Sequence, residues 1–210
     1  MRTKILIVDS HPVVREGLKQ TFAHKTDCEI VGDLGSCIEI FEFVRTNPVD
    51  LIISEIDLPE LNGITALRAI KKEHKAVKIL MFSHQPEEIY AISTIKAGAS
   101  GYLSKSASSS HILKAVDTIK NGEIFLSEKM DKHHKYTETS KSRTRLFKRL
   151  STREVEVLKL LSIGKKNKQI AEELDINEKT VSTYKARLFK KLNVNNIIDL
   201  VHQAKHHDLA

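Results

Sequence analysis

Short apolar runs alternate with longer amphipathic stretches over roughly the first 125 residues, and this alternation leaves very few folds open to the chain. Runs such as 5–8, 51–53 and 77–82 have the length and composition of buried strands. The stretches between them repeat apolar residues at helical spacing. Five strands that alternate with five helices predict a parallel sheet with helices on both faces, which is a doubly wound α/β fold.

The predicted elements can be placed from the same pattern. The strands are expected at 5–8, 29–31, 51–53, 77–82 and 101–103, and Asn121-Gly122 is expected to end the last helix. The five helices are marked by apolar residues at helical spacing: Val14, Leu18 and Phe22; Ile38, Phe41 and Val44; Ile64, Leu67 and Ile70; Ile89, Ile92 and Ile95; and Ile112, Val116 and Ile119.

Polar side chains follow the ends of four predicted strands. Asp9 and Ser10 follow the first strand, Glu55 the third, Ser83 the fourth and Lys105 the fifth. Parallel strands bring their carboxyl ends to one edge of the sheet, and folds of this class carry their chemistry outside that edge. We therefore expect these five side chains to meet in one pocket.

Three stretches around these residues resemble the receiver domains of two-component response regulators. They are Ile7–Pro12, Leu58–Gly63 and Lys96–Lys105, and the resemblance spans roughly residues 3–125. It implies a flavodoxin-like (βα)5 receiver domain, which we place at residues 1–125.

The resemblance also implies roles for the pocket residues. In receivers, two acids after the first strand and an Asp after the third hold Mg²⁺, and that Asp accepts a phosphoryl group from a histidine kinase. A hydroxyl and a lysine bind the phosphoryl oxygens, and an aromatic side chain near the fifth strand changes rotamer on activation. By position, the first acid, the hydroxyl, the lysine and the aromatic residue are Asp9, Ser83, Lys105 and Tyr102.

Two positions depart from the receiver pattern: Ser10 replaces the second acid, and Glu55 replaces the phosphoacceptor Asp. Mg²⁺ prefers near-octahedral oxygen ligands, so Asp9 and Glu55 alone predict a weak or absent metal site. The extra methylene group of Glu55 displaces its carboxylate from the position that in-line phosphoryl transfer needs. The same carboxylate reaches toward the phosphoryl position, where it can pair with Lys105 and hydrogen-bond Ser83.

Three interpretations of this receiver stay open. It can be active-like without phosphate, it can be a scaffold that acts through dimerisation or a partner regulator, or it can still be phosphorylated on Glu55. Asp57 is a poorer acceptor, because it lies two residues into the loop and its side chain should miss the pocket. We expect no required cofactor, with Mg²⁺ binding at most weak.

Positive charge is concentrated late in the chain. Residues 1–128 contain 15 Lys and Arg against 17 Asp and Glu, whereas residues 129–210 contain 19 against 10. Such asymmetry indicates a module for a polyanion such as nucleic acid, although a merely soluble basic domain would have the same composition. Residues 126–147 lack apolar periodicity and predict a solvated linker. His133 and His134 in this linker are accompanied by no Cys and by no ordered acidic partner, so a flexible polar linker is favoured over a metal site.

Residues 148–210 have the pattern of a small all-α domain. Ser151 and Glu154 have the spacing of a capping box, at the start of a helix that Gly164 should end. Asn167 is expected to cap a second helix and Asn177 a third over 178–192, with a last helix over 195–206. Two helices joined by so short a turn form a helix-turn-helix unit, whose second helix enters the major groove of DNA.

The stretches Leu150–Leu158, Asn167–Ala171 and Lys179–Leu192 resemble the LuxR/NarL (FixJ) class of DNA-binding domain. The resemblance implies that helix 178–192 contacts DNA. Ser182, Thr183 and Ala186 correspond to positions that face base edges, where they can offer hydroxyl and methyl contacts. The remaining candidates suit phosphates, or else form a solvated face: Lys179, Tyr184, Lys185 and Arg187, with Lys190 nearer the far end of the helix.

These features together predict a DNA-binding transcription regulator of the two-component type. A homodimer should bind an inverted repeat, and the apolar residues Ile197, Ile198 and Val201 are candidates for its contact surface. An enzyme is the first rival, but no nucleophile and base accompany the carboxylates of Asp9 and Glu55, so we expect none. A receiver that mainly binds a partner regulator is the second rival.

The compartment follows from what the sequence lacks. No run approaches the roughly 18 apolar residues of a membrane helix, and the first strand is too short to be a signal peptide. Cys28 and Cys37 are the only cysteines and form no CxxC motif. We therefore expect a cytoplasmic protein without a membrane partner.

Overall fold

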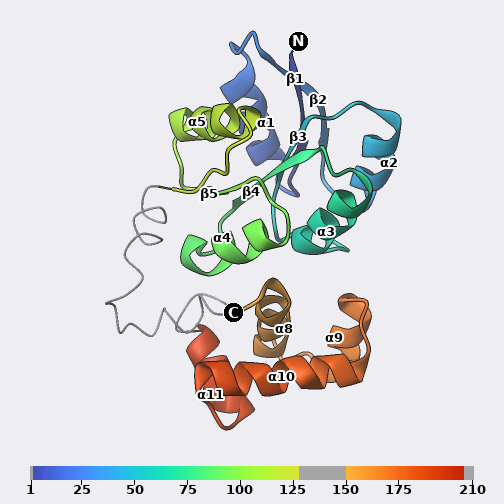
Figure 1. The fold of residues 1–210 in the computed structure, drawn as a ribbon, viewed down its shortest axis with the longest axis vertical. Coiled ribbons are helices and arrows are strands. Elements are labelled where there is room, and N and C mark those ends of the chain that lie inside the picture. Colours follow the sequence, from blue (N-terminus) through green and yellow to red (C-terminus); the bar gives the residue numbers. More distant parts are fainter. Residues whose placement is uncertain (1, 128–149, 206–210) are drawn as a thin grey trace. The chain divides into compact units, whose positions relative to one another are not determined.

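The computed structural model describes residues 2–127 and 150–205, which form an α/β unit and a helical unit (Figure 1). Most of the predicted linker lies outside the described residues, as do His133, His134 and both ends of the predicted second domain. Within the described residues, no helix combines the length and the apolar character needed to cross a membrane.

The α/β unit contains the predicted parallel sheet. Its strands are β1 (Thr3–Val8), β2 (Cys28–Leu34), β3 (Leu51–Ser54), β4 (Lys78–Ser83) and β5 (Gly101–Ser104). All four strand pairs are parallel, and the order across the sheet is β2-β1-β3-β4-β5. The order reverses direction at β1 and β3, so the crevice between their carboxyl ends is the expected place for a site.

Five helices connect these strands: α1 (Pro12–Phe22), α2 (Ile38–Thr46), α3 (Gly63–Glu73), α4 (Glu87–Lys96) and α5 (Ser109–Lys120). Helices α1 and α5 cover one face of the sheet, and α2 and α3 lie on the other (Figure 1). Pro12 occupies the first turn of α1, where its missing N–H costs no helical hydrogen bond. Gly122, with a φ of 86°, follows the end of α5 as predicted.

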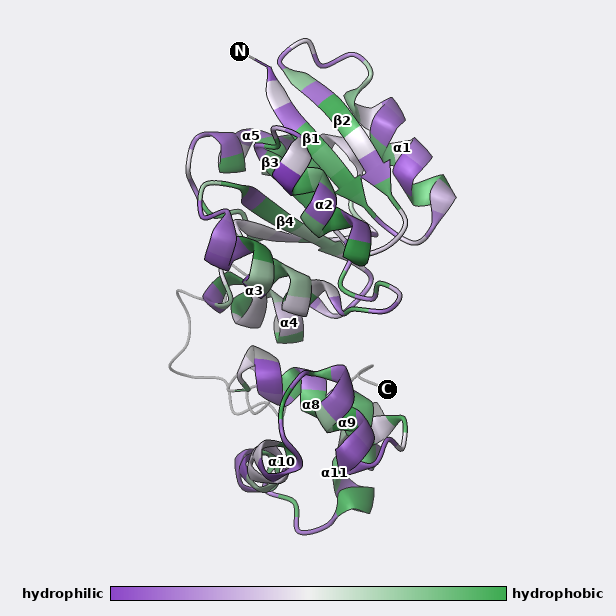
Figure 2. Cartoon of the chain, turned by 90° about the vertical axis from the view of Figure 1, so that its right-hand side faces the viewer, coloured by the Kyte–Doolittle hydropathy of each residue, from purple (hydrophilic) through white to green (hydrophobic). Residues whose placement is uncertain are grey.

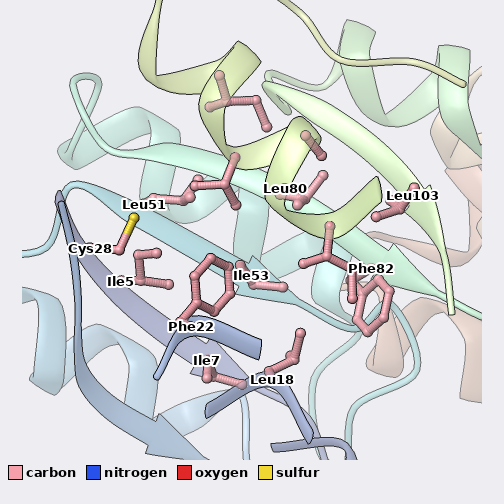
Figure 3. Close-up of a cluster of buried hydrophobic side chains, with 14 of the residues drawn as sticks. Ile5, Ile7, Leu18, Phe22, Cys28, Leu51, Ile53, Leu80, Phe82 and Leu103 are labelled. Atoms are coloured by element: carbon pink, nitrogen blue, oxygen red, sulfur yellow. The ribbon is translucent and has the colours of Figure 1, made fainter. Parts of the chain in front are cut away.

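A buried apolar cluster lies between the sheet and the helices α1 and α5 (Figure 3). Ile5 and Ile7 contribute to it from β1, Ile53 from β3, and Leu18 and Phe22 from α1. Hydrophobic colour is concentrated on the strands, while the helices carry hydrophilic residues on their outer sides (Figure 2). The strands β1, β3 and β4 are buried along most of their length, as expected for a parallel sheet that is covered on both faces.

Helix α2 buries only one of the three apolar residues whose spacing predicted it. Ile40 and Val44 are its buried residues, whereas the side chains of Ile38 and Phe41 are 60% and 36% exposed. The predicted helix is present, and of Ile38, Phe41 and Val44 only Val44 is buried. Both sets of positions have helical spacing, so only packing against the sheet decides between them.

The helical unit consists of α8 (Thr152–Ser162), α9 (Asn167–Glu173), α10 (Glu178–Leu192) and α11 (Ile197–Lys205). The predicted capping box is present, because Ser151 accepts from the Glu154 N–H and the Glu154 carboxylate accepts from the Ser151 N–H. Asn177 caps α10 as predicted, by accepting from the Thr180 N–H at 2.8 Å. The cap of α9 is Lys166, so the prediction of Asn167 was wrong by one residue.

An ion pair joins the first and third helices of this unit. Lys191 Nζ lies 2.7 Å from Glu154 Oε2, and the Glu154 side chain is only 2% exposed. Val181, Leu188 and Leu192 form the predicted buried stripe of α10 beside this pair. The inward face of α10 is thereby held against α8, which leaves the opposite face to the solvent.

Candidate functional site

Three of the predicted pocket residues meet at the carboxyl edge of the sheet. Lys105 Nζ lies 2.6 Å from Asp9 Oδ2 and 2.7 Å from Glu55 Oε2, so one ammonium group bridges two carboxylates. Both carboxylates are buried, since Asp9 and Glu55 are each 1% exposed. At this burial the ion pairs are little screened by salt.

Burial and ion pairing act in opposite directions on Lys105. Burial lowers the pKa of its ammonium group, but hydrogen bonds from that group to Asp9 and Glu55 raise the pKa more. The net pKa of Lys105 is therefore above its ordinary value, and the bridging cation is present at neutral pH.

The first strand end fixes Asp9 through its backbone and its neighbours. Asp9 Oδ1 accepts from the His11 backbone N–H at 2.9 Å, and the His11 Nδ1 atom lies 3.0 Å from the same oxygen. Arg15 donates to the Asp9 carbonyl at 2.6 Å. The half-buried Ser10 contributes Oγ, 3.3 Å from His11 Nδ1, so the histidine contacts both residues of the strand end.

Glu55 turns its longer side chain back onto its own loop. Its Oε1 atom accepts from the backbone N–H groups of Ile56, at 2.6 Å, and Asp57, at 3.3 Å. The start of α3 lies close above this loop, because a Cβ atom on Gly63 would stand 2.2 Å from the Glu55 carbonyl oxygen. Only glycine fits there, and the loop that holds the carboxylate is correspondingly tight.

His84, which the sequence reasoning did not select, lies at the rim of the pocket. Its Nδ1 atom is 3.5 Å from Glu55 Oε2, and its Nε2 atom is 3.6 Å from Asp57 Oδ2. Asp57 therefore lies at the rim of the pocket, next to His84. The sequence offered one clue to this role of His84, because the residue directly follows the pocket residue Ser83. His11 directly follows Ser10 at the end of the first strand in the same way.

Ser83 and Tyr102 occupy their predicted places on the strands. Ser83 ends β4 and is fully buried, and its carbonyl accepts from the Lys105 backbone N–H at 2.8 Å. Tyr102 lies on β5 and is also fully buried. The predicted hydrogen bond between the Ser83 hydroxyl and Glu55 stays a prediction.

The donors in this pocket do not fit a Mg²⁺ ion. The metal needs several oxygen ligands in octahedral arrangement, and the pocket supplies two carboxylates without a third at Ser10. Each oxygen of Asp9 and Glu55 already contacts an N–H group or a cation. Within the described ranges, no group of three or more His, Cys, Asp or Glu side chains is placed to hold a metal.

The solvent face of α10 carries most of the residues that the sequence predicts to contact nucleic acid. Ser182, Thr183, Ala186, Arg187 and Lys190 are exposed there, and so is Lys179 near the helix start. Tyr184 and Lys185 are half-buried. One helix thus presents small side chains in its middle and cations around them.

Two cations of α10 lie over aromatic rings of the same helix. The Arg187 guanidinium is 5.9 Å from the centre of the Tyr184 ring, and Lys185 Nζ is 5.9 Å from the centre of the Phe189 ring. These contacts restrict long side chains that would otherwise move freely. Lys191 differs from them, because its partner is the buried carboxylate of Glu154.

A parallel α/β domain with a pocket at its carboxyl edge, followed by a helix-turn-helix unit, defines a two-domain regulator. Residues 5–117 match the family model of the response regulator receiver domain, and residues 148–204 match that of the luxR family of bacterial regulatory proteins. The chain therefore belongs to the response regulators that join a receiver domain to a LuxR-family domain.

Similar proteins of nearly equal length support this assignment. The Fimbriae Z protein of Salmonella typhimurium is 36% identical over 205 residues, which are 98% of this chain and 97% of that protein. The response regulator UvrY of Escherichia coli is 29% identical and covers 98% of this chain and 95% of its own. The putative positive transcription regulator of virulence factors BvgA of Bordetella pertussis is 30% identical over the whole of both chains.

Solved structures agree on the fold. The RcsB response regulator of Salmonella typhimurium has a TM-score of 0.79 at 22% identity, over 99% of both chains. RcsB bound to the promoter rprA in the presence of the phosphomimetic BeF₃⁻ has a TM-score of 0.80 at 22% identity, over 96% of this chain and 98% of that one.

Proposed function

We propose that this protein binds promoter DNA as a homodimer and regulates transcription, with a receiver that acts without phosphoryl transfer. The observation that carries the proposal for the receiver is the bridge from Lys105 to both Asp9 and Glu55 in the buried pocket. We assign the receiver to residues 1–125, the linker to 126–147 and the DNA-binding domain to 148–210. Bacterial promoters lie in the cytoplasm, so the proposal places the protein there.

The exposed face of α10 supports DNA binding. Its middle offers Ser182, Thr183 and Ala186 to base edges, while Lys179 and Arg187 lie where they can contact phosphates. The net charge of the chain, +7, favours association with a polyanion. RcsB, which shares the fold, has been solved bound to the promoters rprA and P1flhDC.

A homodimer suits this geometry, because each recognition helix would contact one half of an inverted repeat. RcsB has been solved as two dimers bound to two parallel DNAs. On α11, Ile198 is 76% exposed, and Ile197 and Val201 are half-buried. We propose this side of α11 as the contact between two DNA-binding domains. Ile198→Glu should weaken binding to a full inverted repeat and leave binding to a half-site unchanged.

The pocket supports independence from phosphate. An added phosphoryl group would bring about two negative charges and three acceptor oxygens, which attract the lysine of a receiver. Here Glu55 already supplies a negative charge to Lys105 at 2.7 Å. The carboxylate also engages the backbone of its loop through Ile56 and Asp57. No catalytic role follows from these residues, so we propose a regulator and no enzyme.

Selection of bound sequences from a random DNA library tests the proposal with the full chain. We expect an enriched motif with two inverted half-sites, obtained from protein that was never exposed to a phosphodonor. A histidine kinase or a partner regulator would be indicated if the motif appeared only after phosphorylation or only when that regulator was added. Binding without any sequence enrichment in all three conditions would contradict the proposal.

A further inference from the structure

The hydroxyl groups in the middle of α10 donate hydrogen bonds to backbone carbonyl groups of the same helix. Thr183 Oγ1 donates to the Lys179 carbonyl at 2.9 Å, and Ser182 Oγ donates to the Glu178 carbonyl at 3.0 Å. A hydroxyl group has a single proton, so in this arrangement neither side chain offers a donor to a base.

The Ser182 hydroxyl oxygen also accepts a hydrogen bond. Asn167 Nδ2, at the first position of α9, donates to Ser182 Oγ at 3.2 Å. Asn167 is the first residue of α9, after the cap Lys166, and its side chain reaches the recognition helix. Ser182 is thereby held between α9 and its own helix, and it has one lone pair left.

Thr183 and Ala186 remain as the side chains that face outward in the middle of the helix. They are exposed and three residues apart, so their methyl groups lie on one side of α10. The Thr183 oxygen keeps its acceptor capacity after its proton is used. The small side chains in the middle of the helix therefore present methyl groups and an acceptor, whereas the nearby donors of Lys185 and Arg187 lie over the rings of Phe189 and Tyr184.

The major groove contains one base with a matching surface. Thymine presents a 5-methyl group, and its partner adenine presents an amino group that donates. Guanine presents two acceptors, N7 and O6, which require donors that Ser182, Thr183 and Ala186 do not offer. We propose that Thr183 and Ala186 select an A·T base pair in each half-site, by packing their methyl groups on the thymine methyl group while Thr183 Oγ1 accepts from adenine. This inference rests on the proposed DNA-binding function.

Replacement of thymine by deoxyuridine removes only the methyl group and tests the proposal on the wild-type protein. Each thymine of the selected half-site is replaced in turn, and the Kd is measured by fluorescence anisotropy. At one position the substitution should weaken binding roughly fourfold, the ratio that corresponds to one buried methyl group. If no deoxyuridine substitution weakens binding, the proposal is wrong.

Two variants of Thr183 separate its methyl group from its hydroxyl group. Thr183→Val keeps the methyl group, and Thr183→Ser keeps the hydroxyl group. We expect Thr183→Val to keep a roughly fourfold preference for the thymine site over the deoxyuridine site, and we expect Thr183→Ser to lose most of that preference. The loss of the adenine contact in Thr183→Val should weaken binding to both sites alike. If Thr183→Ser keeps the full preference for thymine, the Thr183 methyl group does not contact the thymine methyl group and the proposal is wrong.

A matched control comes from the receiver. Thr46 Oγ1 donates to the Glu42 carbonyl at 2.9 Å, which is the same bond one turn back along a helix. Thr46→Ser should leave DNA binding unchanged. If wild-type protein enriches no DNA motif at all, the proposed function fails and this inference falls with it. A motif without an A·T pair at the centre of its half-site contradicts this inference alone.

Discussion

Lys105 Nζ lies 2.7 Å from Glu55 Oε2, at the position where the receiver pattern would have a phosphorylated Asp attract the lysine. The same ammonium group also contacts Asp9, so the two strand ends and β5 are linked without a phosphoryl group. The effect of Glu55 should be partial, because one carboxylate carries less charge and fewer oxygens than a phosphoryl group.

Glu55→Gln tests the charge of this side chain at nearly constant size. The variant should destabilise the receiver by about 1.5–3 kcal/mol, since a buried hydrogen bond to a charged group is lost. The variant should also dimerise more weakly, which sedimentation measures, and bind the promoter with lower affinity, which fluorescence anisotropy measures. Glu73→Gln makes the same change on an exposed position of α3 and should have no effect. Equal dimerisation by Glu55→Gln and wild type would make the receiver a scaffold.

Restoring both missing acids should restore phosphorylation. Ser10→Asp combined with Glu55→Asp returns the second metal ligand and the shorter acceptor, so Mg²⁺ and acetyl phosphate should add one phosphoryl group, read by intact mass. Each single change serves as a control and should react poorly, because the metal site or the acceptor is still missing. A double variant that gains no mass would show that another feature, such as His84 at the rim, blocks the pocket.

The cations of α10 should act on all DNA sequences alike. Lys179→Ala and Lys185→Ala should each weaken binding and reduce the slope of log Kd against log salt by about one unit. Lys72→Ala, which removes an exposed lysine from α3 of the receiver, is the matched control. An unchanged slope for Lys185→Ala would mean that its ammonium stays over the Phe189 ring and contacts no phosphate.

The pair of Glu154 and Lys191 should make the helical unit sensitive to acid. Burial raises the pKa of Glu154, but Lys191 and Ser151 lower it more, so the folded pKa lies below the ordinary value of 4.5. The pair therefore stabilises the unit above that value, and the contribution disappears as the pH falls through the folded pKa. Glu154→Gln should cost about 1 kcal/mol at neutral pH, since Lys191 is one-third exposed.

Hydrogen exchange of α8 and α10 amides in the full chain measures this cost. The difference in the free energy of unfolding of this unit between wild type and Glu154→Gln should become smaller as the pH is lowered below 4.5. A difference that stays constant with pH would mean that the ion pair contributes little and that packing carries the effect.

Much of the fold follows from the sequence because burial is periodic. Asp9, Glu55 and Lys105 each follow the end of a predicted strand. Parallel pairing of these strands then brings the three residues to the carboxyl edge of the sheet. The roles of His11 and His84 did not follow, because periodicity places a residue at a strand end and does not give the direction of its side chain. The contact between Asn167 and Ser182 was missed for a related reason, since a side chain that fits a cap can also reach another helix.

The central claim is that the receiver acts without phosphate, and promoter affinity tests it most directly. Wild-type protein is incubated with and without Mg²⁺ and acetyl phosphate, and each sample is divided between intact mass analysis and titration of the selected promoter fragment. We predict no added phosphoryl mass and a Kd that changes by less than about twofold. A phosphorylated protein that binds the promoter about tenfold more tightly, a gain of about 1.4 kcal/mol, would contradict the account.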